Sequence, residues 1–222
     1  MELNNLIINV AIGGWYHKGQ KRLLKSLKNN FDGDIITWCE EFPNDNYNKE
    51  NAYNCKAAAF EEVLNKGYKN ILWLDSSVWA VNNVQPIFDI IERDGYYFID
   101  NGYNCAQTCS DACLNYYKIS RDLAETYKEV ASGIFGVSLQ SEIGWKFIER
   151  LIKGCKDGAS NGSRLHDNQS EDERFLFHRQ DQSVASIVLA KMGLKPNDTW
   201  GNLCEYDSNN LKGKTILTLK GM

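Results

Sequence analysis

The fold of this chain is indicated most clearly by one stretch, Ile71-Leu72-Trp73-Leu74-Asp75-Ser76-Ser77-Val78-Trp79-Ala80-Val81. Its first half is a short apolar run without a charged residue, which is typical of a strand buried on both faces. Asp75 ends this run with a carboxylate, at the point where such a strand would leave the core. We therefore expect a strand over residues 70–75 whose polar end lies at an edge of a sheet.

Similar strand-like runs alternate with amphipathic segments on both sides of this stretch. Strands are expected at residues 6–12, 34–39, 96–100 and 215–219, and within 129–138, where Ser132-Gly133 interrupts the run. Helices are expected at residues 18–30, 50–66, 84–93, 110–118, 142–153 and 180–192. The alternation predicts one α/β domain over residues 1–222, with a mainly parallel central sheet and helices on both faces. The polar residues 157–174 are expected to form a flexible loop or lid.

Composition places the chain among folded proteins and disfavours two functional classes. Of its 222 residues, 43% are hydrophobic and 24% are charged, which is the usual balance of a globular domain. The formal net charge of −4 disfavours a dedicated nucleic-acid binder, because such proteins normally carry a basic surface. No apolar segment is long enough to span a bilayer, so integral membrane association is not expected. Seven cysteines, an odd number, without a signal peptide predict reduced thiols and a cytoplasmic location.

Small and polar residues follow several of the expected strands. In open parallel sheets, ligands bind at the carboxyl ends of the strands, where loops and helix N-termini meet. Four groups of residues fall at such ends: Gly13-Gly14-Trp15-Tyr16, Asp75-Ser76-Ser77, Asp100-Asn101-Gly102 and Ser132-Gly133. We expect the functional site among them.

The stretch at residues 71–81 resembles the strand-plus-acid signature of nucleotide-sugar glycosyltransferases of the A-type fold, whose usual form is Asp-x-Asp. Upstream, Lys56 begins an Ala-rich helix, as a basic residue does in several such families. Downstream, residues 131–137 look like the family's glycine-bearing strand, and residues 178–183 resemble the Asp-Gln that opens a late helix. The order and spacing match from Leu6 to Met192. The resemblance implies a Rossmann-like three-layer domain of the glycosyltransferase A type.

The resemblance also implies an activity, the transfer of a sugar from a nucleotide-diphosphate donor to a hydroxyl acceptor. Asp181 and Gln182 are the implied catalytic residues, with Asp181 as general base if transfer inverts the anomeric centre. If transfer retains it, either residue would orient or stabilise the sugar. The implied donor-binding residues are Gly13, Trp15, Tyr16, Lys56, Asp75, Ser77, Ser132, Gly133, His178 and Arg179. Trp15 and Tyr16 are expected either to stack on the nucleotide base or to cover the sheet edge.

Whether the donor needs a divalent cation is left open by the sequence. In the family the last acid of Asp-x-Asp binds Mn²⁺ or Mg²⁺, but here Ser77 stands in its place. A hydroxyl is a poorer ligand than a carboxylate for these ions. Either Asp75 binds the metal with water, or basic residues hold the phosphates, the candidates being Lys56, Lys21, Arg22 and Arg179.

Cys105, Cys109 and Cys113 are spaced four residues apart and would lie along one face of a helix. Zinc sites normally use cysteine pairs two to four residues apart with a distant fourth ligand, and this spacing also fits no standard iron–sulfur run. We therefore expect these cysteines to be small buried thiols of the core.

Two other functions remain open. A nucleotidyltransferase would place a basic, glycine-rich loop after the first strand, whereas Gly13-Gly14 is followed by aromatic residues. A non-catalytic nucleotide-sugar-binding module would be consistent with Ser77. For the transferase, the acceptor is a glycan, a lipid-linked sugar, a protein side chain or a modified nucleobase. Its binding site is expected to be formed by residues 100–113 and the loop at 157–174.

Overall fold

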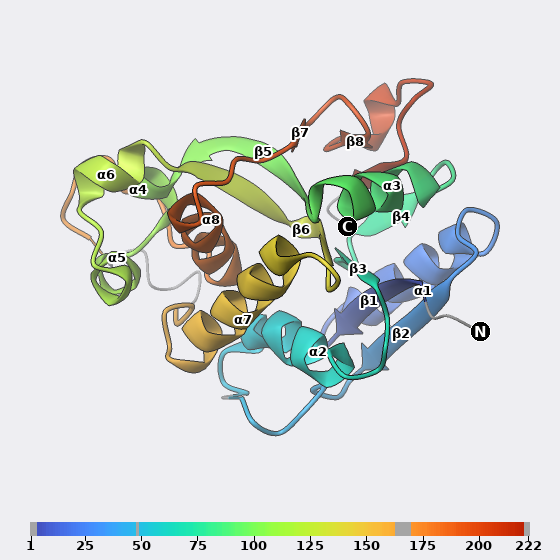
Figure 1. Ribbon diagram of the computed structural model, residues 1–222, viewed down its shortest axis with the longest axis horizontal. Coiled ribbons are helices and arrows are strands. Elements are labelled where there is room, and N and C mark those ends of the chain that lie inside the picture. The colour runs from blue at the N-terminus through green and yellow to red at the C-terminus, as the bar shows by residue number, and fades with distance from the viewer. Residues whose placement is uncertain (1–3, 48, 163–169, 220–222) are drawn as a thin grey trace.

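Six strands form the main sheet, in the spatial order β2-β1-β3-β6-β5-β7, and helices pack on both of its faces (Figure 1). The computed structural model describes residues 4–47, 49–162 and 170–219. The strands are β1 (Asn5–Ala11), β2 (Asp34–Cys39), β3 (Asn70–Leu74), β4 (Val78–Ala80), β5 (Tyr96–Asn104), β6 (Lys128–Ser138), β7 (Asp198–Thr199), β8 (Cys204–Glu205) and β9 (Leu217–Leu219).

The α-helices are α1 (Tyr16–Leu27), α2 (Cys55–Val63), α3 (Gln85–Asp94), α4 (Cys105–Thr108), α5 (Asp111–Tyr117), α6 (Arg121–Glu125), α7 (Glu142–Lys156) and α8 (Asp181–Lys191). Two short 3-10 helices, Ala52–Asn54 and Ser208–Asn210, complete the described elements. The α/β class predicted from the alternating pattern is confirmed. None of the helices in the described ranges is long and apolar enough to cross a bilayer.

The sheet is mainly parallel, as predicted, but it is mixed because one strand, β6, runs in the opposite direction to the others. Strand β1 is parallel to both β2 and β3, and β5 is parallel to β7, but β6 runs antiparallel to both of its neighbours, β3 and β5. The reason lies in the connection from β5 to β6. Helices α4, α5 and α6 return the chain to the edge at which β5 ends, instead of crossing to the opposite edge as a parallel connection must.

Alternate residues of the central strands supply two separate cores. Leu6, Ile8 and Trp73 face the core formed with α2, α7 and α8. Ile7 and Leu72 point the opposite way, into the core formed with α1 and α3. Because a strand directs successive side chains to opposite faces, an apolar run without polar gaps is what a sheet covered on both faces requires.

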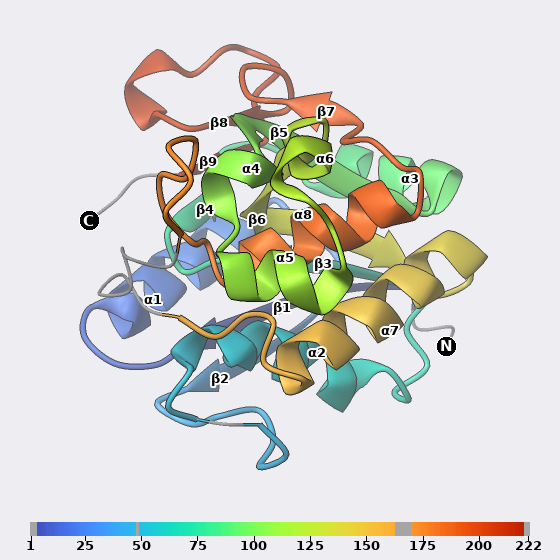
Figure 2. The same ribbon diagram turned by 90° about the vertical axis from the view of Figure 1, so that its left-hand side faces the viewer.

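The C-terminal strands β8 and β9 join β4 in a second, three-stranded sheet, in the order β4-β9-β8. Strand β4 follows Asp75 by three residues, so this small sheet begins next to the carboxyl end of β3. Figure 2 shows the C-terminal segment, drawn in red, along the top of the molecule past β7 and β8. The sequence predicted only a strand at residues 215–219, because runs of two or three residues are too short to show a periodic pattern.

Candidate functional site

The polar residues predicted to follow the strands meet at one edge of the main sheet. Strands β1, β3 and β5 end at this edge, and β6 begins there because it runs in the opposite direction. The Asp75 N–H donates to the Gly133 carbonyl (2.8 Å), which joins the end of β3 to the start of β6. Helix α8 begins at Asp181 close to the same point.

A buried lysine holds the centre of this edge. The Lys56 Nζ lies 2.6 Å from Asp181 Oδ2 and 3.6 Å from Asp75 Oδ1. It also donates to the carbonyl (2.6 Å) and the hydroxyl (3.0 Å) of Ser132. An ammonium has three N–H donors, so these four neighbouring acceptors use its full capacity. We call Lys56, Asp75 and Asp181 the charged cluster.

Burial and neighbouring charge act against each other in the charged cluster. The side chains of Lys56 and Asp181 are each only 6% exposed, whereas that of Asp75 is 40% exposed. Burial alone would lower the pKa of the Lys56 ammonium, but the carboxylates of Asp181 and Asp75 outweigh it and raise that pKa. Desolvation raises the pKa of Asp75, Lys56 opposes this shift, and the nearby Asp181 adds to it. The cluster therefore has one partly exposed carboxylate supported by a buried ion pair.

The helix dipoles act in opposite directions on the two partners of this pair. Lys56 lies in the first turn of α2, where the positive end of the helix dipole disfavours a cation. Asp181 lies in the first turn of α8, where the same effect favours an anion. The residue before it, Gln180, has φ 48° and ψ −116°, a combination that is strained for any residue but glycine. This strained junction, 4% exposed, sets the position of the Asp181 carboxylate.

Asp75 is oriented by the strand that carries it and by the facing strand. The Trp73 indole N–H donates to Asp75 Oδ1 (2.6 Å), and the Trp73 ring lies 5.0 Å from Lys56 Nζ. On the other side, a β-carbon at Gly133 would come within 3.1 Å of Asp75 Oδ2. Glycine at 133 therefore leaves room for the carboxylate.

Strand β6 bends where Ser132 and Gly133 lie. On β5, Phe98 pairs with Phe135 of β6, and Asp100, two residues later, pairs with Val130, which is five residues from Phe135. Strand β6 therefore has extra residues in this interval. The sequence predicted that Ser132-Gly133 breaks the strand. Instead, β6 continues through these residues and carries the irregularity as a bulge, because its pairing with β3 is unbroken up to Ile134 and Asp75 bonds to Gly133 beyond it.

A hydrogen-bond network extends from the charged cluster to the C-terminal segment. The Gln182 Oε1 accepts from the N–H (3.2 Å) and hydroxyl (3.3 Å) of Ser132, and its Nε2 donates to Glu129 Oε1 (2.7 Å). Asn101 Nδ2 donates to Glu129 Oε2 (2.7 Å), and the Trp200 indole N–H donates to Asn101 Oδ1 (3.1 Å). We call Gln182, Glu129, Asn101 and Trp200 the relay.

Glu129 is the site residue that the sequence did not predict. It is fully buried at the start of β6, and burial raises its pKa while the hydrogen bonds from Asn101 and Gln182 oppose the shift. A single glutamate at the start of a strand usually reads as an exposed residue, and its partners are 28 and 53 positions away in the sequence. Trp200 was missed for the same reason, because only the fold brings it to Asn101.

The turn after β1 lies at the same edge but makes different contacts. Gly13 and Gly14 both have positive φ, 74° and 53°. The Gly13 N–H donates to the Glu40 carboxylate (3.2 Å) at the end of β2. Trp15 and Tyr16 stack on each other with ring centroids 4.4 Å apart, and Tyr16 is 44% exposed. Their stacking on a nucleotide base stays a prediction.

Several predicted basic or polar residues are engaged elsewhere. Arg22 donates to the Ser77 carbonyl (2.8 Å) and packs over the Trp79 ring (4.2 Å), so it supports the backbone after Asp75. His178 is 6% exposed, and its Nδ1 accepts from the Ser110 N–H (3.2 Å). The Arg179 guanidinium packs over Phe177 (4.5 Å).

Of the predicted site residues, the structure brings together those that surround Lys56: Lys56, Asp75, Ser132, Gly133, Asp181 and Gln182. The other predicted residues make contacts elsewhere: Gly13 with Glu40, Trp15 with Tyr16, Ser77 with Arg22, His178 with Ser110, and Arg179 with Phe177. The former group is therefore the centre of the candidate site, and the others lie around it or behind it.

The loop expected at residues 157–174 is described at its two ends, while residues 163–169 lie outside the described ranges. Its later end is attached to the helices after β5. Ser170 donates to Asp111, and the Arg174 guanidinium pairs with Asp122 (2.9 Å) and Glu125 (2.8 Å). These contacts fix the described end against α5 and α6.

Cys105, Cys109 and Cys113 are buried in the core, as predicted. They do not share one helix, because α4 ends at Thr108 and α5 begins at Asp111. Burial alone would raise the pKa of the Cys109 thiol, but hydrogen bonds from the other two thiols and the nearby His178 hold it well below its ordinary value. Within the described ranges, no group of three or more His, Cys, Asp or Glu side chains is arranged to hold a metal ion.

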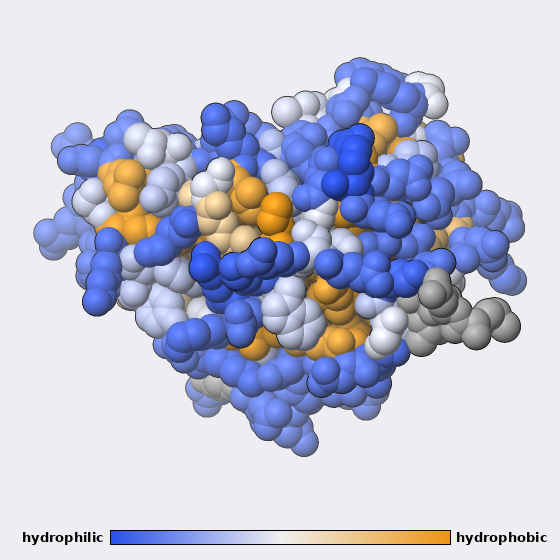
Figure 3. Space-filling model, viewed as in Figure 1, coloured by the Kyte–Doolittle hydropathy of each residue, from blue (hydrophilic) through white to orange (hydrophobic). Residues whose placement is uncertain are grey.

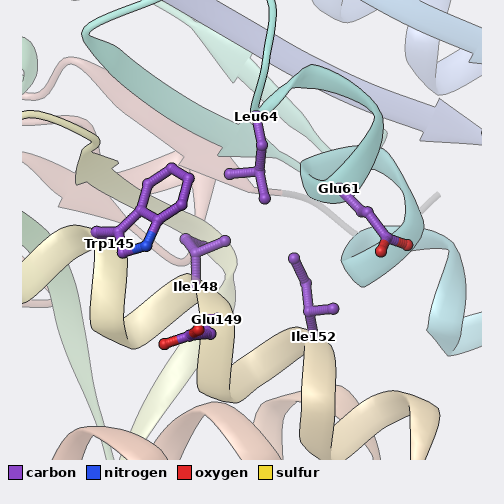
Figure 4. Close-up of a pocket in the computed structure, with 6 residues that line it drawn as sticks. All are labelled: Glu61, Leu64, Trp145, Ile148, Glu149 and Ile152. Atoms are coloured by element: carbon purple, nitrogen blue, oxygen red, sulfur yellow. The ribbon is translucent and has the colours of Figure 1, made fainter.

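A surface groove lies away from this edge, between α2 and α7. Its lining residues are Glu61, Leu64, Trp145, Ile148, Glu149 and Ile152 (Figure 4). Figure 3 shows apolar residues over this part of the molecule, within a mostly hydrophilic face. Apart from the two glutamates the lining is apolar or aromatic, and the Glu61 carboxylate is paired with Lys156 (2.5 Å).

Comparison with models of known protein families finds none that matches this chain, and comparison with curated protein sequences finds no similar one. The function is therefore inferred from the geometry of the charged cluster and the relay.

Proposed function

We propose that this protein is a glycosyltransferase of the A-type fold, which transfers a sugar from a nucleotide-diphosphate donor to a hydroxyl acceptor. One observation carries the proposal. Asp75 follows the central strand β3, and 40% of its side chain is exposed. Its carboxylate lies 3.6 Å from Lys56 Nζ, which is itself paired with the buried Asp181. A supported acid at this position is what the resemblance to the Asp-x-Asp signature implies.

A second line of support comes from which residues converge. Four separate segments contribute to the cluster: the start of α2, the end of β3, the bulge of β6 and the start of α8. The same four segments carry the sequence resemblance, through Lys56, Asp75, Ser132-Gly133 and Asp181-Gln182. If the short motifs resembled the family only by chance, their side chains would not be expected to contact one another in the fold. The contacts among Lys56, Asp75, Ser132 and Asp181 therefore favour the proposal.

Lys56 does not hold the donor phosphates directly in this proposal. Its N–H donors are already taken by Asp181, Ser132 and Asp75. Its contribution is to hold the two carboxylates in place. The Trp73 indole N–H (2.6 Å) and the Lys56 ammonium (3.6 Å) both hold Asp75 Oδ1, so Asp75 presents its charge in a fixed position.

The chemistry of the site fits a divalent cation bound with the donor. Two carboxylates, Asp75 and Asp181, lie beside the single ammonium of Lys56, and a third, Glu129, is joined to them through Gln182 and Ser132. A nucleotide diphosphate would add further negative charge. Mg²⁺ is commonly held by one or two carboxylates together with substrate phosphates and water, so Asp75 alone can serve as the protein ligand. Such an ion would offset the charge of the pyrophosphate.

Asp181 and Gln182 suit positioning better than proton transfer. The Asp181 carboxylate is buried against Lys56, which leaves little access for an acceptor hydroxyl. The Gln182 amide uses both of its ends on Ser132 and Glu129. Of the two roles that the sequence left open for these residues, orientation of the sugar side of the site is the better supported.

The turn after β1 argues against a nucleotidyltransferase. Such an enzyme grips a triphosphate with the backbone N–H groups of a glycine-rich turn. Here the Gly13 N–H donates to the Glu40 carboxylate, which would repel a phosphate at that position.

The proposal is tested by a thermal-shift screen of nucleotide-diphosphate sugars and free nucleotides, each with Mn²⁺, Mg²⁺ or EDTA. A ligand that binds the native state raises the melting temperature by mass action. We expect a shift with one nucleotide class that EDTA removes, and slow release of the nucleoside diphosphate from that donor. No shift with any nucleotide would contradict the proposal, whereas a shift without release or transfer would favour the non-catalytic binding module.

A further inference from the structure

An exposed aromatic pair lies at the outer end of the relay. The Trp200 and Tyr206 rings meet edge to face with centroids 5.6 Å apart, and Tyr206 is 68% exposed. An exposure of this size is unusual for an aromatic side chain, since burying one such ring is strongly favourable. The pair is held in place by the Trp200 indole N–H, which donates to Asn101 (3.1 Å).

The pair is connected to the candidate site by direct hydrogen bonds. From Trp200 the relay passes through Asn101 and Glu129 to Gln182, and Gln182 in turn accepts from Ser132, to which Lys56 donates. Each link is 3.3 Å or shorter. A molecule resting on Tyr206 would therefore be linked through the relay to the residues around Lys56.

A second aromatic pair lies along β5 from Asn101. The Tyr103 and Phe177 rings meet edge to face at 5.7 Å, and Tyr103 is 40% exposed. Asn101 and Gly102 separate it in sequence from Asp100, whose carboxylate pairs with Lys128. Aromatic faces and hydrogen-bonding side chains thus alternate along this edge.

The charges around the two pairs disfavour a polyanionic ligand. Lys128 is paired with Asp100, and Lys212 lies 3.3 Å from Glu205, so these ammonium groups are already balanced. Glu129 adds a buried negative charge between the pairs. Nucleic-acid binding relies on a surplus of basic groups, whereas here two ammonium groups are paired with carboxylates and the Arg179 guanidinium packs over Phe177.

We propose that the surface formed by Trp200, Tyr206 and Asn101 is a saccharide-binding subsite, where the acceptor rests. Sugar rings present C–H groups that pack on aromatic faces, while their hydroxyls pair with amide and carboxylate groups at the ring edges. A rigid aromatic residue with a polar neighbour supplies both at low entropic cost. The acceptor role rests on the proposed transferase function, but saccharide binding by this surface does not.

The test measures saccharide binding without any nucleotide. Saturation-transfer NMR is recorded with methyl glycosides of glucose, galactose, mannose and N-acetylglucosamine, with their trisaccharides, and with a Ser/Thr-rich peptide. Tyr206→Ala removes the exposed ring, Tyr206→Phe keeps it, and Tyr53→Ala removes a ring that is 37% exposed outside this surface. Because Tyr206 is mostly exposed, its truncation leaves the core untouched.

We expect at least one saccharide to bind the wild-type protein, and Tyr206→Ala to weaken it about threefold to tenfold, as loss of one aromatic contact does. Tyr206→Phe and Tyr53→Ala should bind as the wild type does. The proposal is overturned if no saccharide binds, if Tyr206→Ala binds normally, or if only the peptide binds.

The two proposals fail in different ways. Loss of saccharide binding in Tyr206→Ala should leave the donor-induced thermal shift unchanged, because the donor is expected at Asp75. If saccharides bind but no nucleotide does, the transferase proposal fails and the subsite stands. If a nucleotide binds and no saccharide does, the subsite fails and the transferase proposal stands.

Discussion

Helix α2 takes part in two regions that both pair a lysine with a carboxylate, yet they differ in nearly every other respect. At its start, Lys56 is 6% exposed and pairs with Asp181, which is equally buried. Near its end, Glu61 pairs with Lys156 beside the groove, where the two side chains are 30% and 35% exposed. The groove is a hollow with an apolar lining, whereas the charged cluster concentrates buried polar groups, a strained residue and a bulge.

The two regions differ in the free energy needed to bury their charged groups, which is small at the groove and large at the charged cluster. A partly exposed ion pair contributes little to stability and needs no further hydrogen bonds to persist. A buried one is expensive to desolvate, so it persists only where hydrogen bonds complete it, as Ser132 does for Lys56. Strain at Gln180 is a further cost at the same place. Because these unfavourable terms gather at one edge of the sheet, we propose this edge, and not the groove, as the functional site.

The largest difference between the two regions is expected in their ion pairs. Lys56→Met leaves two carboxylates without their cation, one of them buried, and should lower the free energy of unfolding by about 3–5 kcal/mol. Lys156→Met at the groove should lower it by no more than about 1 kcal/mol. Urea denaturation at pH 7 measures both.

A double variant shows whether the loss of stability in Lys56→Met comes from the unpaired carboxylates or from general disruption of the fold. Lys56→Met combined with Asp181→Asn removes the buried cation and its nearest anion together, and should recover part of the lost stability. Equal losses for Lys56→Met and Lys156→Met would show that the charged cluster is no different from an ordinary surface pair.

The next largest effect concerns the relay. Glu129 accepts two N–H groups, so Glu129→Gln places an amide against the donors of Asn101 and Gln182, and one of these must turn. We expect the transfer rate to fall about tenfold, since small displacements at a site cost of that order or more. The matched control is Glu149→Gln at the groove, which should leave the rate unchanged. If the Glu129→Gln variant transfers sugar at the wild-type rate, the relay has no role in the reaction.

The same variant has a pH signature. Burial raises the folded-state pKa of Glu129 above its ordinary value of 4.5, so the native state binds this proton more tightly than the unfolded state. The resulting stability is present below pH 4.5 and is lost as the pH rises through the folded pKa. Glu129→Gln lacks this loss, so its stability relative to wild type should rise over that interval. A difference that stays flat with pH, as expected for Glu149→Gln, would contradict burial as the cause.

A smaller effect should separate two glycines. Gly133→Ala brings a β-carbon within 3.1 Å of Asp75 Oδ2 and 3.4 Å of Leu219 Cδ2, so the carboxylate must shift by a few tenths of an ångström. Donor affinity should fall about threefold to tenfold, the effect of a slightly misplaced ligand group. Gly213→Ala, where a β-carbon meets nothing within 4 Å, should bind the donor normally. Titration calorimetry compares the two, and equal affinities would argue against Asp75 as a donor contact.

The smallest effect is expected in the groove itself. Trp145 is 43% exposed on α7, and Trp145→Ala should leave both the donor-induced shift and the transfer rate unchanged. If Trp145→Ala loses donor binding, the donor binds at the groove and not at the charged cluster.

Much of this site could be predicted from sequence, because its central residues follow strong local patterns. The strand at 34–39 was predicted at both ends, and Asp75 was placed at the end of the next parallel strand because an apolar run precedes it. The short contact between Lys56 and Asp181 could not be predicted, since it joins two helix starts 125 positions apart in the sequence. Sequence order indicated which residues matter, and only the fold showed how they pair.

The direction of β6 shows the other limit. Its apolar pattern is the same whether the strand runs parallel or antiparallel, so the pattern cannot decide. The choice depends on the path through α4 to α6, which returns β6 to the edge where β5 ends. That reversal buries Glu129 beside Asn101 and creates the relay, which explains why Glu129 and Trp200 escaped prediction.

The most direct test of the central claim compares one carboxylate from each region. Asp75→Asn and Glu149→Gln each remove a single negative charge, one from the charged cluster and one from the groove. With the nucleotide sugar that stabilises the wild-type protein in Mn²⁺, the donor-induced thermal shift should disappear in Asp75→Asn and persist in Glu149→Gln. A full shift in Asp75→Asn would contradict the assignment of the donor site to the end of β3.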